Sequence, residues 1–287
     1  MKQLNYMLVF LVGFFFQLSL AQPTENSLLW KVSGNGLTSE SYLFGTLHAT
    51  CDATLSDKVV DAFHQTEQLA LELDMSDQGL QMKMAQQMYI PGGKSIQDFM
   101  TEEEFEALSK NLEGKLMGMN LAMLQNVKPL FINIMLIPAI LECPQQAFDL
   151  SLLQLAQAQE MPIIGLEEVE DQMKALSAIS IEDQVKELLE GSENNLEKSK
   201  KELLTMLALY DNEDILGLEK FMKENESSLT ANTEDLLDKR NESWIPVIEK
   251  MMKEKPSFFG FGALHLVGEK GVIQLLRNQG YQVEAIR

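Results

Sequence analysis

One pattern, an apolar strand-like run that ends in Phe-Gly-x-Leu-His, occurs near both ends of this chain, as FGTLH at 44–48 and FGALH at 261–265. The chain has three histidines, and two of them end these runs. Glycine allows close backbone approach, and open α/β sheets bind ligands at the carboxyl edge of their strands. The pattern therefore predicts two equivalent strand ends, and two imidazoles that face one site if the strands are neighbours.

Strand-like and helical segments alternate beside these two motifs. Gly34, Asn35 and Gly36 form a turn signal between the first two strand-like runs, which predicts a hairpin. Later runs follow the order strand, helix, strand, which is typical of a parallel sheet. The strand-like runs lie at 27–34, 41–48, 68–75, 161–167, 257–266 and 281–286, and the helices between them at 57–67, 148–160 and 271–280.

Two long stretches, about 78–141 and 170–253, have helical periodicity instead. A capping box at Thr101 and Glu104 begins one of these helices. The sequence therefore predicts an α/β fold, with a central mixed sheet completed by both ends of the chain and a large helical insertion. Because no internal repeat or low-complexity linker divides it, we expect residues 22–287 to form a single domain.

Residues 1–21 have the pattern of a cleaved secretory signal peptide. Lys2 precedes an apolar run at 7–20, and small residues stand near a cleavage point after Ala21. The alternative is an uncleaved anchor, although the run is short for a membrane span. We expect an exported protein, periplasmic or secreted, with no stable membrane span after cleavage.

The net charge excludes one class of partner. The whole chain carries −20, and the predicted mature chain, which lacks Lys2, carries −21. Such a charge repels nucleic acid and anionic lipid. We therefore expect no nucleic-acid partner.

Cys51 and Cys143 are the two cysteines of the chain. In an exported protein such a pair is more often a disulfide than a metal site, so a disulfide is predicted. This disulfide would hold the loop that follows His48 in place. Two free buried thiols are the alternative.

Glu72 interrupts the apolar run LALEL, which otherwise has the pattern of a buried strand. A carboxylate buried without a partner would cost several kcal/mol, and a metal ion or a cationic side chain would remove that cost. Together with His48 and His265 it would make an open metal site that activates water. The alternatives are structural histidines and a solvated glutamate on an edge strand.

Three further residues are candidates for catalysis. Glu167 follows the short run PIIGL and could orient a ligand histidine or act as general base. Arg240 and Asn241, on a long helix, could contact an anionic intermediate or a substrate carboxylate. A helix-start acid and a charged helix face are the alternative interpretations.

Several segments together resemble the TraB/GumN family, to which the Tiki metalloproteases are related. The resemblance implies a core in which two Gly-x-x-His motifs and an acidic residue form a metal-dependent hydrolase site. The wider group also includes erythromycin-esterase-like and haem-binding ChaN-like proteins. The segments, in chain order, are LLWKVSGNGLTSESYLFGTLH, LALELD, FDLSLLQLAQAQEMPIIGLEEVEDQ, KRNESWIPVIEKMM and FGFGALHLVGEKGVIQLLRNQGYQVEAI.

Residue by residue, the resemblance covers the candidates already described. Asp149 matches a family aspartate that usually follows glycine, whereas Phe148 precedes it here, which leaves a close-packing or substrate-facing role open. The motif histidines fall on His48 and His265, the strand glutamate on Glu72, the glutamate of GLE on Glu167, and the helical Arg-Asn pair on Arg240 and Asn241.

These observations and the resemblance predict an exported metal-dependent hydrolase, in particular a peptidase, with a peptide or another small extracytoplasmic molecule as its substrate. The two motif histidines and the strand glutamate would bind a divalent ion such as Mn, Co or Zn. Glu167 would accept a proton, and Arg240 or Asn241 would stabilise the oxyanion. The alternatives are a non-catalytic extracytoplasmic protein that binds metal or haem, and an interaction protein of the cell envelope.

Overall fold

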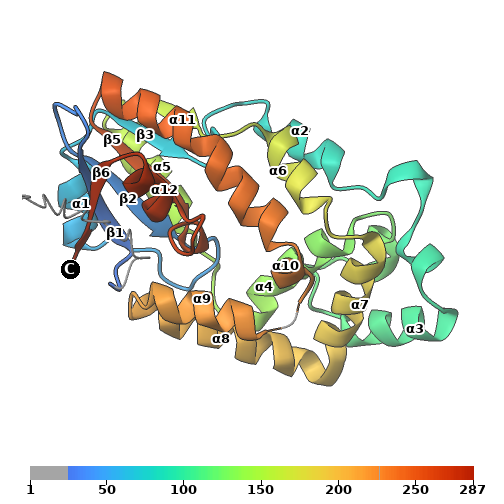
Figure 1. Ribbon diagram of the computed structural model, residues 1–287. Helices are drawn as coiled ribbons and strands as arrows, with labels where there is room; N and C mark the ends of the chain where they lie inside the picture. The colour runs from blue at the N-terminus through green and yellow to red at the C-terminus, as the bar shows by residue number, and fades with distance from the viewer. Residues whose placement is uncertain (1–24, 226) are drawn as a thin grey trace, which may run out of the picture.

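The computed structural model describes residues 25–225 and 227–287, so the predicted signal peptide at 1–21 lies outside the described residues. In Figure 1 the strands gather at one end of the molecule with α1, α5 and α12. Most of the other helices gather at the opposite end, and α11 runs between the two ends. The helices are α1 (Asp57–Phe63), α2 (Leu80–Gln87), α3 (Glu102–Asn111), α4 (Pro129–Leu141), α5 (Phe148–Ala158), α6 (Val169–Leu176), α7 (Ile181–Ser192), α8 (Glu197–Asp211), α9 (Ile215–Glu224), α10 (Ser228–Ala231), α11 (Lys239–Glu254) and α12 (Val272–Asn278).

One mixed six-stranded sheet has the order β4-β3-β5-β2-β1-β6. Strand β1 is antiparallel to both its neighbours, whereas β2, β5, β3 and β4 pair in parallel. The first two and the last two strands come from opposite ends of the chain, which confirms the predicted α/β fold. The strands are β1 (Leu29–Gly34), β2 (Ser41–Thr46), β3 (Gln68–Leu71), β4 (Ile163–Gly165), β5 (Ser257–Gly262) and β6 (Tyr281–Ile286).

The two motif-bearing strands, β2 and β5, are parallel neighbours. Their register pairs Gly45 with Phe261 and Thr46 with Gly262. The two pentapeptides are therefore offset by one residue, although both end at the same edge of the sheet. Almost every residue of these strands is buried, as expected for parallel strands with long apolar runs.

Aromatic side chains pack helices against both faces of the sheet. Phe258 of β5 lies 5.2 Å from Phe63 of α1 between ring centroids, on one face. On the other face, Phe261 lies 5.7 Å from Trp244 of α11. These contacts fix α11 beside the carboxyl edge of β5, where the second motif ends.

The helices between β3 and β5 build a second apolar core of their own. Its fully buried members include Ile96, Leu108, Ile132 and Leu188. Short 3-10 turns connect these helices, and a π-helical turn, η5 (Glu234–Asp238), leads directly into α11. Across residues 25–225 and 227–287, no helix combines the length and the apolarity needed to cross a membrane. The short turns are η1 (Pro91–Gly93), η2 (Ile96–Phe99), η3 (Leu121–Leu124), η4 (Glu193–Leu196) and η6 (Ala263–His265).

Candidate functional site

The carboxyl ends of β2, β3 and β5 bring together the two motif histidines and the strand glutamate. His48 follows β2, Glu72 follows β3 directly, and His265 ends the 3-10 turn η6 after β5. The Nε2 atoms of the two histidines each lie 3.8 Å from the same oxygen, Oε1 of Glu72. Residues more than two hundred positions apart thus converge on one carboxylate.

Gly262 keeps the space between these three groups open. Its backbone N–H donates a hydrogen bond of 2.8 Å to Oε1 of Glu72. A Cβ at this position would lie 3.4 Å from that oxygen and 3.6 Å from Nε2 of His48 and from Cδ2 of His265. A methyl group here would therefore occupy the centre of the site.

Gly45, the glycine of the first motif, has a different function. A Cβ there would lie 2.7 Å from Cδ1 of Leu266 and 2.9 Å from Cα of Ala263. Such distances are shorter than van der Waals contact, so only glycine lets η6 pack this closely on β2. The two motifs are alike in sequence, but one glycine serves packing and the other the site.

Asp149 orients His48. Its Oδ2 lies 2.8 Å from Nδ1 of His48, and its Oδ1 accepts a hydrogen bond of 2.9 Å from the hydroxyl of Thr46. Desolvation opposes a charged imidazole, but the hydrogen bond and the charge of Asp149 outweigh it and raise the pKa of His48. The side chain of His48 is 65% exposed, so it forms the open side of the site.

Asn241 orients His265. Its amide nitrogen donates to the carbonyl of Lys270 at 2.9 Å, so its Oδ1 is the acceptor that faces Nδ1 of His265 at 2.6 Å. Nδ1 therefore carries the proton, and the lone pair of Nε2 faces the site. Burial lowers the pKa of His265 to about 3, with Arg240 acting in the same direction, and this keeps the ring neutral. A neutral ring in this tautomer is the form that binds a metal ion.

Arg240 is the buried cation of the site. Its Nη2 donates hydrogen bonds of 2.6 Å to Oε2 of Glu72 and to Oε1 of Glu167. Its Nε also donates to both oxygens of Glu167, and Trp244 Nε1 donates to Oε2 of Glu167 at 3.1 Å. Both oxygens of Glu167 are thus engaged.

The two carboxylates that Arg240 joins have opposite pKa shifts. Burial would raise the pKa of Glu72, but the two imidazoles and Arg240 lower it to about 2. For Glu167 burial prevails over the hydrogen bonds and charge of Arg240, and its pKa is raised. Glu72 therefore stays ionised and able to bind a cation.

The donor set and the charge of the site suit a divalent ion. Two imidazoles and one carboxylate are common ligands of catalytic zinc. Three carboxylates, Glu72, Asp149 and Glu167, against one guanidinium leave a formal charge of −2 once His48 has released its proton, since His265 is already neutral. A divalent cation would balance that charge.

The spacing, however, is not that of a ready-made metal centre. Among residues 25–225 and 227–287 no group of three His, Cys, Asp or Glu side chains has the geometry to hold an ion as it stands. The 3.8 Å separations exceed the about 3.3 Å between two ligand atoms of tetrahedral zinc. Nη1 of Arg240 also lies 3.3 Å from Nε2 of His265. Of the three side chains, the exposed His48 has the most room to move.

Two contacts of the site were not anticipated from sequence. Gln172 of α6 donates a hydrogen bond of 3.2 Å to Oε2 of Glu72. The ring of Trp244 packs 4.5 Å from that of His265 between centroids. Both residues lie within the segments that carry the family resemblance, but no periodicity distinguishes them from ordinary helix residues.

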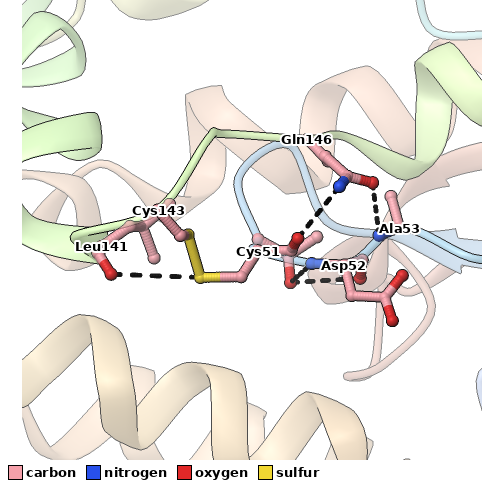
Figure 2. Close-up of a disulfide and its surroundings, with 7 residues drawn as sticks. Cys51, Asp52, Ala53, Leu141, Cys143 and Gln146 are labelled. Atoms are coloured by element: carbon pink, nitrogen blue, oxygen red, sulfur yellow. Dashed lines mark hydrogen bonds between the residues drawn. A yellow bond between two sulfur atoms is a disulfide. The ribbon is translucent and has the colours of Figure 1, made fainter.

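The predicted disulfide is present, and its first cysteine, Cys51, follows His48 in the same loop. Cys51 and Cys143 are joined, with 5.8 Å between their Cα atoms. Figure 2 shows the side chain of Gln146 beside the bridge, donating to the carbonyl of Cys51 and accepting from the N–H of Ala53. Thr50 and Gln146 also pair through their backbones. The loop that holds His48 is thus fastened to the segment that leads into α5 and Asp149.

Comparison with known proteins is consistent with this geometry. Metalloprotease TIKI2 of Xenopus tropicalis is 25% identical over 92% of this chain and 60% of its own length. Metalloprotease TIKI1 of Danio rerio and of Homo sapiens are 23% and 22% identical, over 92% and 93% of this chain. The chain spans 64% and 63% of those two relatives. No solved structure matches the chain. The model of the TraB/PrgY/gumN family matches residues 28–285, and the chain therefore belongs to this family.

Proposed function

We propose that this protein is a metal-dependent hydrolase that acts on peptides, in which His48, Glu72 and His265 hold a divalent ion such as Mn, Co or Zn. The observation that carries the proposal is the convergence of two imidazole Nε2 atoms on one buried carboxylate oxygen. Each imidazole has its own orienting partner, as metal-bound histidines do. The names of the relatives support the same reaction class.

The chemistry of the proposal divides between the ion and the chain. A bound divalent ion would lower the pKa of a water molecule and polarise the scissile carbonyl. Asp149 and Asn241 would hold the two imidazoles in the tautomer that leaves Nε2 free. Gly262 would keep the space between the ligands clear.

The contacts of Glu167 and Asn241 support positioning functions. Glu167 binds Arg240 and Trp244 through both oxygens, so proton transfer through Glu167 requires one of these contacts to break. Asn241 lies behind His265 and is 1% exposed, which favours orientation of that ring over contact with an oxyanion. Of the predicted oxyanion donors, Arg240 is the one that borders a cavity.

We also propose that the protein is exported, to the periplasm or beyond the cell. The disulfide supports this, because disulfides persist in oxidising compartments.

A second candidate function, metal binding without catalysis, is favoured by one observation. Glu167 is already paired, which leaves it no oxygen free to act as base.

Calorimetric titration of metal-free residues 22–287 with Mn, Co and Zn tests the proposed site. The variant is His48→Ala, because this side chain is exposed and its loss does not disturb the core. The matched control is His64→Ala, which removes the exposed histidine that follows α1. We expect about one ion per chain in wild type and control, and loss of binding in His48→Ala.

Hydrolysis of a peptide library by the metal-loaded protein, with and without chelator, tests the reaction. Chelator-sensitive cleavage that His48→Ala abolishes and His64→Ala preserves is the expected result. Equal metal binding by the two histidine variants would refute the site. Stoichiometric binding without cleavage of any peptide would favour the non-catalytic candidate.

A further inference from the structure

A cavity of about 830 Å³ lies beside the candidate site, with Arg240 in its wall. It is formed between α9, the segment 230–238 and the loop 264–270 that follows β5. Its volume lies in the range of pockets that hold small ligands or side chains. Its apolar lining comes from Met222, Leu236, Leu237, Leu264 and Val267.

Two wall residues connect the cavity to the site. The backbone carbonyl of Leu236 accepts a hydrogen bond of 2.9 Å from Nη1 of Arg240. Leu264 immediately precedes His265 in the turn η6. A group bound in the cavity would therefore lie close to the residues that surround the Nε2 atom of His265.

The π-helical turn η5 shapes this wall. It supplies Leu236, Leu237 and Asp238 to the cavity and passes directly into α11, which carries Arg240. Single π-helical turns are rare and occur often at functional sites, because the extra residue shifts the side chains that follow. The turn is thus a second, independent sign that this wall serves a ligand.

The chemistry of the cavity favours an apolar occupant over an anionic one. Arg240 has five N–H donors, and its three nitrogens already face carboxylates, the carbonyl of Leu236 and Nε2 of His265. Lys223 pairs with Glu219 at 2.6 Å, and Lys270 pairs with Glu242 at 3.2 Å. A carboxylate that entered would lose water and gain no unpaired cation from these groups.

We propose that this cavity is a specificity subsite that takes one apolar side chain of a peptide substrate, of the size of Leu or Phe, next to the bond that is cleaved. The inference rests on the proposed function. To the proposed hydrolase it adds a preference for apolar side chains, and it names the cavity wall that would select them.

The probes are capped tripeptide amides, acetyl-Ala-X-Ala-amide, in which X is Leu, Phe, Ala or Asp. Their binding and their cleavage by metal-loaded residues 22–287 are measured separately. We expect the Leu and Phe peptides to bind at least tenfold more tightly than the Ala peptide, because a larger apolar surface leaves water. The Asp peptide should bind more weakly than the Ala peptide.

Met222→Trp tests the cavity itself, because the larger ring fills it from the α9 side. The matched control is Met82→Trp, at an α2 side chain that is 68% exposed and does not line the cavity. We expect Met222→Trp to abolish the tenfold preference and Met82→Trp to keep it. Equal thermal unfolding of the two variants shows that neither change disturbs the fold.

The outcomes separate the subsite from the proposed function. A preference for Leu and Phe in binding that Met222→Trp removes, without cleavage of any peptide, supports the subsite and refutes the hydrolase. Cleavage with equal kcat/KM for Leu, Ala and Asp peptides, or with a preference that Met222→Trp leaves unchanged, overturns the subsite and leaves the hydrolase standing. If the protein neither binds nor cleaves any of the peptides, both the subsite and the hydrolase are overturned.

Discussion

Replacement of Arg240 by Met is the most informative single change in the site. The side chains of Glu72 and Glu167 are 9% and 3% exposed, and both depend on this guanidinium for charge balance. Removal of one partner from a buried ion pair costs about 3–5 kcal/mol, because a charge is left uncompensated. With methionine of similar length in its place, we expect the free energy of unfolding to fall by about this amount at pH 8.

The loss in free energy of unfolding caused by Arg240→Met should depend on pH in a defined direction. In the variant, Glu167 stays buried without its cation, so its pKa in the folded state rises further above the unfolded value of about 4.3, whereas Glu72 keeps the two imidazoles beside it. The folded variant then binds protons that the unfolded chain does not, so its stability falls as pH rises above that value. The difference between wild type and Arg240→Met should therefore be larger at pH 8 than at pH 5.

Urea unfolding in buffer with chelator measures both effects, since a bound cation would otherwise replace the lost charge. The double variant Arg240→Met/Glu167→Gln should recover part of the loss, because it removes the charge of Glu167 that has lost its cation. Arg277→Met is the matched control. Arg277 packs over Trp30 and donates to the carbonyl of Val283, so its loss should show little of this pH dependence. Equal stability of Arg240→Met and wild type at pH 8, or a deficit that does not shrink by pH 5, would refute the reasoning.

Three further predictions concern the surroundings of the site. Cys51→Ser/Cys143→Ser releases a 92-residue loop and should cost about 4–5 kcal/mol in urea unfolding by the chain-entropy model; a loss below about 1 kcal/mol would contradict it. Asp149→Asn removes the carboxylate that orients His48 and should weaken metal binding about 10–100-fold in calorimetry, and unchanged affinity would count against that function. His265, with a folded pKa of about 3 and an ordinary value of 6.5, binds its proton more readily in the unfolded chain, so metal-free protein should lose stability as pH falls from 6.5 towards 3. His265→Gln should flatten this part of the stability profile.

The sheet could be predicted from sequence because its strands are buried apolar runs bounded by turn residues. The hairpin turn, for example, has positive φ at Gly34, Asn35 and Gly36, which is the geometry that these residue types favour. The capping box of Thr101 and Glu104 also forms as predicted. The division of the apolar residues into two cores could not be predicted, because an amphipathic helix does not specify which partner covers its apolar face.

The convergence of His48, Glu72 and His265 follows from a simple rule, since the carboxyl ends of parallel strands meet at one edge. The sequence singled out Glu167 and Arg240 separately but not their mutual pairing. That ion pair depends on how α11 lies against the sheet. The one-residue offset between the two motifs also could not be predicted from the sequence, because packing across the strands sets the register.

The pairing of β2 with β5 also has a consequence in time. During synthesis β5 emerges roughly 220 residues after β2, a delay of about 10–40 s at 5–20 residues per second. Until then His48 and Glu72 have no second imidazole, and β2 lacks its parallel neighbour. A chain in which β5 has not yet emerged therefore contains most of the fold's helices but only part of the proposed metal site. The site is therefore complete only after β5 has emerged and paired with β2, and any activity of the site can appear only then.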